Sequence, residues 1–240
     1  MESSLLTLAR KLYHRYLRSR TPRFYALKEQ THGMLNPMIY KKIYGLVYRL
    51  PDLDIVEIGG AAGTASIAMA LAMQKSGKSA RLIVIERCEG GSRTKYGGYR
   101  ENLKIITDNF RKFSVEDKII LYPHEIALET RKEVLALIKT PEIAAFMHDA
   151  DGRLDRDFLV FWPLLRSGGL IIIDDYQEHG SYKHVLTYRL LNQMIKWKLF
   201  TPSFMMRNTI IGYKPANSDI RQLDVDVCLR IIRDCEQLLD

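Results

Sequence analysis

The chain has 240 residues, enough for one domain with a sizeable core and small additions. Its hydrophobic fraction of 47% and charged fraction of 27% are typical of a globular protein, and no window approaches the about 20 consecutive apolar residues that a membrane span needs. Arg10 and Lys11 interrupt the N-terminal apolar stretch too early for a secretory signal. Three cysteines without CxxC spacing favour free thiols and a cytoplasmic location.

The net charge of +8 is concentrated in the first 50 residues, which carry ten lysines and arginines against two glutamates. The segment also contains six tyrosines, and its apolar spacing predicts helices over 4–18 and 37–49. We interpret residues 1–50 as a helical extension with three alternative roles: a cap over an acceptor pocket, a homodimer element, or a solvated basic face.

From residue 54 onward, short apolar runs alternate with helical patterns. Strands are predicted at 54–59, 81–86, 118–123, 143–149, 169–175, 198–205 and 208–214. Helices are predicted at 63–75, 101–113, 127–139, 155–165, 183–196 and 219–238. This alternation is typical of βαβ units, so we expect residues 51–240 to form an α/β domain with a doubly wound, mostly parallel seven-stranded sheet. Ligands of such sheets bind at the carboxyl ends of the strands.

A glycine-containing loop follows the first predicted strand and joins it to its helix. Small residues there let the backbone turn sharply and approach a ligand closely. The glycines at 59, 60 and 63 do not fit the G-x-G-x-x-G spacing of dinucleotide enzymes, which argues against a nicotinamide oxidoreductase. The pattern E-x-G-x-x-x-G instead resembles the first motif of class I methyltransferases. That resemblance implies S-adenosylmethionine as cofactor, bound at Glu57, Gly59, Gly60, Ala61, Gly63 and Thr64.

Further cofactor contacts are predicted after the next strands. Glu86 ends the second strand, where a carboxylate can accept both hydrogen bonds of a ribose diol, and Arg87 follows it. Glu125 and Ile126, after the third strand, occupy the position of the adenine contacts in this family. Asp149, at the end of the fourth strand, completes the predicted cofactor site.

Aspartates follow the fourth and fifth strands. Because these strands are expected to be neighbours about 4.8 Å apart, Asp149 should meet the pair Asp174 and Asp175 at one edge of the sheet. Carboxylates gathered without basic partners need a cation, and an all-oxygen ligand set suits Mg²⁺.

The same run resembles the metal-dependent O-methyltransferases, most closely the group that methylates sugars of macrolide and aminocoumarin antibiotics, and also the catechol and caffeoyl-coenzyme A enzymes. The resemblance implies that Asp149, Asp174 and Asp175 hold the metal and that Asp151 is the general base. His179 is a second candidate base. Gly152 departs from the family, in which many members carry a histidine just after the Asp-x-Asp pair.

The leading functional hypothesis is methyl transfer from S-adenosylmethionine to a hydroxyl of a small molecule, a sugar or a catechol-like phenol, with help from Mg²⁺. A metal-independent small-molecule methyltransferase is one alternative. RNA methylation through the basic N-terminal segment is another, although the fourth strand lacks the Asn-Pro-Pro-Tyr-like motif of many base methyltransferases. A non-catalytic module with a membrane-surface helix is the third, and the three aspartates argue against it.

Overall fold

The computed structural model describes residues 2–89, 97–127 and 129–237. Within them, seven strands form one sheet in the order β3-β2-β1-β4-β5-β7-β6. All neighbouring pairs are parallel except β5–β7 and β6–β7. The strands are β1 (Asp54–Ile58), β2 (Leu82–Ile85), β3 (Ile119–Tyr122), β4 (Ile143–His148), β5 (Leu165–Ile173), β6 (Thr201–Met206) and β7 (Thr209–Tyr213). The predicted fold class is confirmed.

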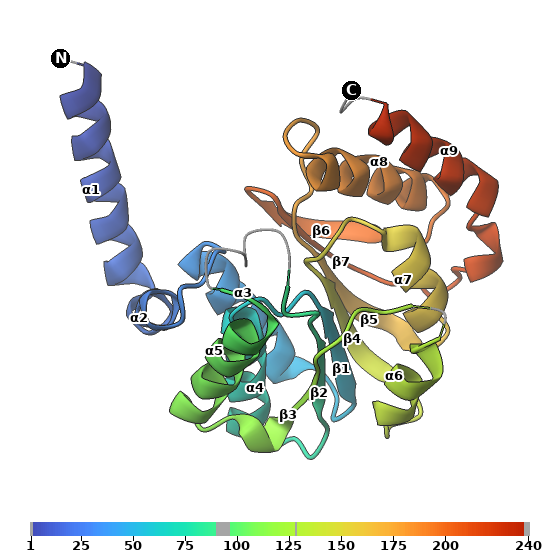
Figure 1. Cartoon of the computed structure of the whole chain (residues 1–240), viewed down its shortest axis with the longest axis horizontal. Coiled ribbons are helices and arrows are strands. Elements are labelled where there is room, and N and C mark those ends of the chain that lie inside the picture. The colour runs from blue at the N-terminus through green and yellow to red at the C-terminus, as the bar shows by residue number, and fades with distance from the viewer. Residues whose placement is uncertain (1, 90–96, 128, 238–240) are drawn as a thin grey trace.

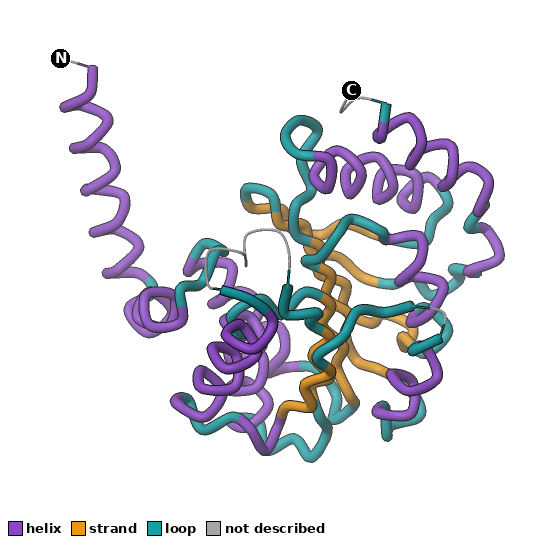
Figure 2. The backbone as a smooth tube through the Cα atoms, viewed as in Figure 1, coloured by secondary structure: helices purple, strands orange, loops and turns teal. Residues whose placement is uncertain are grey.

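Helices cover both faces of the sheet, with α3, α4 and α5 on one side and α6 to α9 on the other (Figures 1 and 2). Their bounds are α1 (Glu2–Arg20), α2 (Pro22–Thr31), α3 (Pro37–Arg49), α4 (Thr64–Lys75), α5 (Tyr99–Lys112), α6 (Arg131–Leu137), α7 (Leu154–Phe161), α8 (Tyr182–Lys196) and α9 (Val225–Glu236). In the described part of the chain, no helix is both long and apolar enough to cross a membrane.

The central strands are continuous apolar runs because both faces of the sheet are covered. Every residue of β1, β2 and β4 is buried, as expected for parallel strands between two helical layers. Helix α4 packs under the N-terminal helices and is buried around most of its circumference, which its alanine-rich sequence permits.

The N-terminal segment is packed into the main structure from α2 onward. Side chains of α2 and α3, including Leu27, Ile39 and Ile43, belong to the same core cluster as β1, β2 and α4. Helix α2 was not predicted from the sequence as a separate helix. The assignment of residues 1–50 as an extension of a 51–240 domain stays a prediction.

Helix α1 projects away from this core (Figure 1). Tyr13 connects it to the rest of the molecule, since its hydroxyl accepts hydrogen bonds from Asn36 Nδ2 at 2.7 Å and Arg207 Nη2 at 3.0 Å. Leu12 and Tyr16 are 57% and 48% exposed.

The packing of α3 predicts that it unfolds together with the sheet. Ile43→Ala, at a position with 0% exposure, should lower the free energy of unfolding by about 2–5 kcal/mol in one cooperative transition, because it leaves a cavity in the shared core. Urea denaturation followed by circular dichroism measures this. Leu12→Ala, at an exposed position of α1, is the matched control and should change stability by less than about 0.5 kcal/mol. A separate early transition in Ile43→Ala would contradict a shared core.

Candidate active site

Two pockets meet at the carboxyl edge of the sheet and share Gly59. The first, here called the helix-side pocket, lies between the α2–α3 connection and the start of α4; its lining includes His32, Tyr40, Glu57, Gly60, Ala61, Thr64, Asn102 and Asp149. The second, the strand-tip pocket, lies over the ends of β1, β2 and β4; its lining includes Glu86, Arg87, Glu125, Ile126, Asp151, Arg156 and Lys183. Together they form one candidate ligand site with two halves.

Gly59 separates the two pockets and can only be glycine. Its φ is +90°, and a Cβ at this position would lie 1.8 Å from the main-chain oxygen of Asp149. The loop after β1 therefore passes directly against the residue that follows β4, and Asp149 N–H donates to the carbonyl of Ile58 at 2.8 Å. Gly63 has a different function: a Cβ there would lie 2.5 Å from the Phe110 ring, so its small size permits helix packing, and it lines neither pocket.

Glu57 is a fully buried carboxyl group at the helix-side pocket. Its Oε2 accepts a hydrogen bond from Ser66 Oγ at 2.5 Å, while Oε1 has no hydrogen-bond partner among the residues that the structure describes. Burial raises the pKa of Glu57 to about 8, although the Ser66 bond lowers it, and the nearby Glu86 carboxylate adds to the increase. A cation entering this pocket would meet an unsatisfied acidic oxygen.

Glu86 connects the loop after β1 to the end of β2 through hydrogen bonds. Its two carboxylate oxygens accept from main-chain N–H groups, Oε2 from Ala61 at 2.6 Å and Oε1 from Cys88 at 2.8 Å. Cys88 has a left-handed φ of +61°, which aims its N–H back at the carboxylate. Beyond it, Glu125 forms an ion pair with Arg87 (3.7 Å), and Ile126 is buried. The predicted ribose and adenine contacts thus lie around one pocket.

The three predicted metal ligands come together. One carboxylate oxygen each of Asp149, Asp174 and Asp175 lies within 4.8 Å of the others. Asp174 accepts from Thr209 Oγ1 at 2.5 Å, and Asp175 adopts a left-handed φ of +59°. Burial and the two neighbouring carboxylates raise the pKa of Asp149 well above its ordinary value; burial also raises the pKa of Asp174, against the Thr209 bond. The cluster is therefore short of positive charge.

Basic partners approach this cluster, contrary to the expectation that it lacks them. Lys183 Nζ lies 2.5 Å from Asp175 Oδ2, and His184 Nε2 lies 3.0 Å from Asp175 Oδ1. Burial opposes the charge of Lys183, but the bond to Asp175 and the charges of the three aspartates together outweigh it and raise the pKa of Lys183. Sequence reasoning missed both residues. The signal was present: the first turn of α8 contains these two basic groups and no acid, the reverse of what the helix dipole favours.

The two candidate bases are placed differently. Asp151 lines the strand-tip pocket, but Arg156 holds it through Nη1–Oδ2 (2.9 Å) and Nη2–Oδ1 (3.2 Å). Burial opposes its ionisation, yet Arg156 lowers the pKa of Asp151 below its ordinary value, which weakens it as a proton acceptor. His179 is exposed in the loop after β5 and lines neither pocket. Their roles in proton transfer stay predictions.

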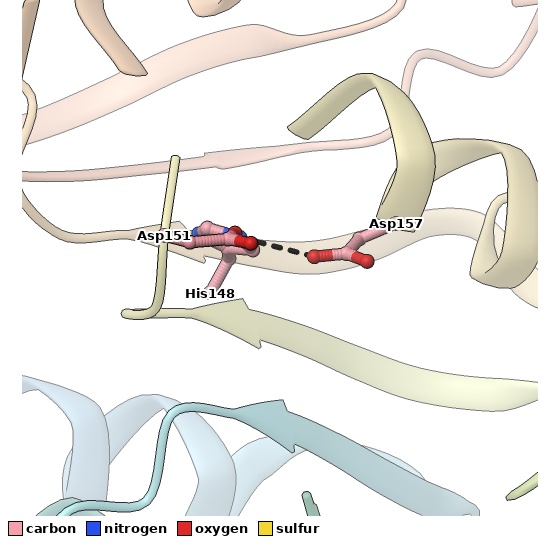
Figure 3. A group of neighbouring side chains, drawn as sticks. All are labelled: His148, Asp151 and Asp157. Atoms are coloured by element: carbon pink, nitrogen blue, oxygen red, sulfur yellow. Dashed lines mark ion pairs between the residues drawn. The ribbon is translucent and has the colours of Figure 1, made fainter. Parts of the chain in front are cut away.

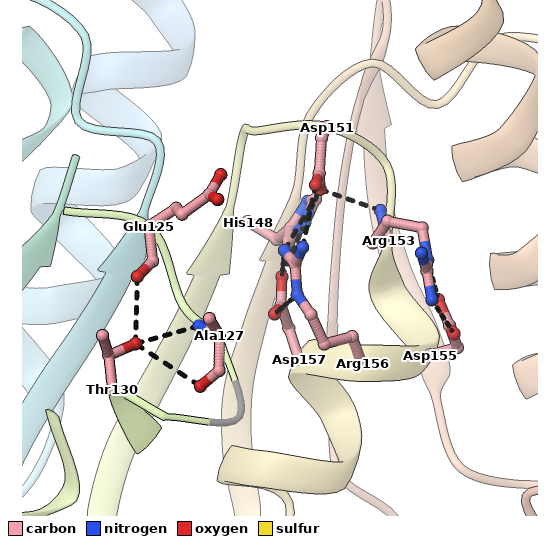
Figure 4. A network of polar contacts seen from close by, with 9 residues as sticks. All are labelled: Glu125, Ala127, Thr130, His148, Asp151, Arg153, Asp155, Arg156 and Asp157. Carbon is pink, nitrogen blue, oxygen red and sulfur yellow. Dashed lines mark hydrogen bonds and ion pairs between the residues drawn. The ribbon is translucent and has the colours of Figure 1, made fainter. Parts of the chain in front are cut away.

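Asp151 belongs to a larger ionic network behind the strand tips (Figure 4). Arg156 lies between Asp151 and the buried Asp157, bonding Asp157 through Nε at 2.7 Å and Nη2 at 3.0 Å. His148 Nε2 is 3.1 Å from Asp157 Oδ2 (Figure 3). The group of His148, Asp151 and Asp157 could in geometry hold a metal, but the guanidinium of Arg156 already supplies its positive charge.

The raised pKa of Glu57 predicts a pH-dependent stability. A raised pKa means that the protonated form favours folding, so this contribution is present in full below about pH 4.5 and is lost as the pH rises through about 8. Between pH 5.5 and pH 8, the unfolding free energy of the wild type should fall by about 3 kcal/mol relative to Glu57→Gln, which does not titrate. Thermal or urea unfolding across this pH range tests it, and parallel curves for the two proteins would refute the assignment.

Comparisons with known proteins agree with this architecture. A family model described as a methyltransferase domain matches residues 56–176. Curated protein sequences yielded no match. Among solved structures, the O-methyltransferase TomG from Streptomyces achromogenes, in complex with S-adenosylmethionine, is 16% identical with a TM-score of 0.58, covering 76% of this chain and 82% of its own.

Two further structures are similar. An O-methyltransferase from Bacillus cereus in complex with S-adenosylhomocysteine is 14% identical with a TM-score of 0.61, covering 85% of this chain and 97% of its own. A candidate caffeoyl-CoA O-methyltransferase from Staphylococcus aureus is 18% identical with a TM-score of 0.63, covering 85% and 99%. At such identities the likeness concerns the fold. The domain match spans half of the chain, from β1 to just beyond β5, and the chain belongs to the methyltransferase domain family.

Proposed function

We propose that this protein is an S-adenosylmethionine-dependent O-methyltransferase that acts on a hydroxyl of a small molecule with the help of a divalent cation. The observation that carries the proposal is the meeting of three features at Gly59: the two pockets and, through Asp149, the aspartate cluster. The similar structures that contain S-adenosylmethionine or S-adenosylhomocysteine support the choice of cofactor.

The two pockets match the two halves of the cofactor. Glu86, Glu125 and Ile126 surround the strand-tip pocket, which suits an adenosine. The helix-side pocket presents the unsatisfied Glu57 oxygen for an ammonium group and the N-terminus of α4, at Thr64, for a carboxylate. A cofactor laid across Gly59 would then place its sulfonium beside Asp149, the residue common to the helix-side pocket and the aspartate cluster.

The aspartate cluster fits a hard divalent cation by its donor chemistry. Asp149, Asp174 and Asp175 offer oxygen ligands only, and the shortage of positive charge around Asp149 is what a cation would relieve. A cation held there would supply Lewis-acid chemistry that lowers the pKa of an acceptor hydroxyl. The chain's own residues would position the acceptor oxygen opposite the sulfonium, and this alignment would account for most of the rate enhancement.

A metal-independent methyltransferase is the second candidate, and one observation favours it. Both oxygens of Asp175 already contact basic groups, Lys183 and His184, so one of the three aspartates has its charge matched from within the chain. In either case the N-terminal segment takes part in the site, since the α2–α3 connection lines the helix-side pocket. Which acceptor enters, sugar or phenol, stays a prediction.

The aspartate cluster is tested by Asp174→Asn. We expect methyl transfer to catechol and sugar acceptors to fall at least about hundredfold, because the cation would lose a charged ligand, while affinity for S-adenosylhomocysteine stays within about twofold. Radiolabelled methyl transfer and calorimetric titration measure the two quantities. Asp219→Asn, at an aspartate paired with Arg221 away from the site, is the control and should retain full activity. Full activity of the wild type in excess chelator would establish the metal-independent alternative instead.

The two-pocket arrangement is tested with cofactor fragments. Glu86→Gln should weaken binding of both adenosine and S-adenosylhomocysteine about tenfold, because the side-chain amide faces two main-chain N–H donors and loses the ionic hydrogen bonds. Glu57→Gln should leave adenosine affinity unchanged and weaken only S-adenosylhomocysteine. Glu89→Gln, at an exposed position near the same strand end, is the control. Equal losses for adenosine in Glu57→Gln and Glu86→Gln would argue against separate pockets.

A further inference from the structure

The start of α8 carries an arrangement that neither the family match nor the proposed chemistry explains. Lys183 and His184 occupy the first turn of the helix, where the exposed N–H groups and the helix dipole disfavour positive charge. No acidic residue of that turn offsets them. Their locally unfavourable position is balanced by Asp175, which both side chains contact.

His184 contributes a hydrogen bond to this arrangement. Its Nδ1 accepts from the main-chain N–H of Ser181 at 3.1 Å, which leaves Nε2 to carry the proton toward Asp175 Oδ1 at 3.0 Å. Lys183 brings a positive charge beside the same carboxylate, since its Nζ lies 2.5 Å from Oδ2.

The backbone around the site holds α8 close enough for this contact. Gly152 has a φ of +85°, and a Cβ there would lie 3.0 Å from the carbonyl oxygen of Lys183 and 3.1 Å from Thr187 Oγ1. A side chain at position 152 would press against the first turns of α8. Asp175 is fixed from the other side, since N–H groups of Asp174 and Tyr176 donate to His148 and Asn208 carbonyls at 3.0 and 2.8 Å. The aspartate is thus held in place while the lysine reaches it on a flexible stem.

The Lys183 side chain can move away from Asp175 into solvent. Its side chain is 39% exposed and lines the strand-tip pocket, so its ammonium can leave Asp175 without being buried elsewhere. A divalent ion among Asp149, Asp174 and Asp175 would repel that ammonium at a few ångströms and would bind the same Asp175 carboxylate that the ammonium now contacts.

We propose that Lys183 is a tethered cation that occupies part of the aspartate cluster in the metal-free protein and competes with a divalent metal ion for Asp175. The proposal rests on the metal-assisted form of the proposed function. The measured metal affinity then reflects how much more strongly the metal ion interacts with the aspartates than the Lys183 ammonium does. Lys183 therefore weakens metal binding and selects against weakly held ions.

The direct test measures Mn²⁺ binding to the full chain from the electron paramagnetic resonance signal of free Mn²⁺. Removing the competitor in Lys183→Met should tighten Mn²⁺ binding about tenfold or more, whereas Lys183→Arg, which keeps the charge, should bind within a few-fold of the wild type. Lys196→Met is the matched control: it removes one exposed lysine from the same helix, about 20 Å along its axis, and should leave the affinity unchanged.

A second measurement uses the wild type and does not depend on the folding of a variant. Reductive methylation of lysines, read by mass spectrometry, should modify Lys183 faster with saturating Mn²⁺ than without it, because the displaced ammonium loses its carboxylate partner. The labelling rate of Lys196 should not change.

The outcomes separate the inference from the function on which it rests. Equal Mn²⁺ affinity in wild type, Lys183→Met and Lys183→Arg, or unchanged labelling of Lys183, would overturn the competition while leaving a metal site. Failure of both wild type and Lys183→Met to bind Mn²⁺ would overturn the competition and the metal-assisted function together. Binding of S-adenosylhomocysteine, measured on the same samples, tests the methyltransferase function independently.

Discussion

Negative charge at the carboxyl edge of the sheet is the constraint around which the site is built. Parallel strands bring Glu57, Glu86, Asp149 and the Asp174–Asp175 pair to one rim, and each carboxylate there is buried or half-buried. Desolvation makes an unmatched charge at such positions unfavourable, so each group must be protonated, hydrogen-bonded or paired. The way in which each carboxyl group is stabilised determines which ligands can bind beside it.

Three solutions are visible side by side. Glu86 is satisfied by two main-chain N–H groups, so it serves the structure of the loops as well as any ligand. Asp151 and Asp157 share the guanidinium of Arg156, which forms a permanent internal ion pair. Glu57 accepts a single hydrogen bond, from Ser66 Oγ, and Asp149 lies beside two other carboxylates; burial raises the pKa of both, and neighbouring carboxylates add to the increase. Glu57 and Asp149 both line the helix-side pocket, where a cationic ligand would supply an opposite charge.

The N-terminal segment contributes differently from what its composition indicates. Much of its basic charge lies on α1, together with the exposed Tyr13 and Tyr16, and this helix projects from the molecule. The parts that reach the site are the connection between α2 and α3, which contributes His32, and the start of α3, which contributes Tyr40; both residues line the helix-side pocket. Thr31 also contacts Thr64 at the start of α4, with 2.7 Å between the hydroxyl oxygens. The segment therefore reaches the site through the α2–α3 connection and the start of α3, and not through the basic helix α1.

Local patterns along the chain predicted the sheet, the helices that cover it and the positions of the acidic residues. Short apolar runs such as Leu82–Ile85, flanked by breaks in the pattern, predict buried strands. The glycine loop and the aspartates come directly after such runs, and both the run and the residues that end it are visible in the local sequence. Which charged side chains contact one another follows from the packing of the elements. Lys183 and Arg156 are ordinary surface residue types in the sequence, and their contacts with Asp175 and Asp151 depend on how α8 and α7 pack on the sheet. Whether two such charged groups come within a few ångströms depends on how each helix packs on the sheet, and the periodicity of a single segment does not specify that packing.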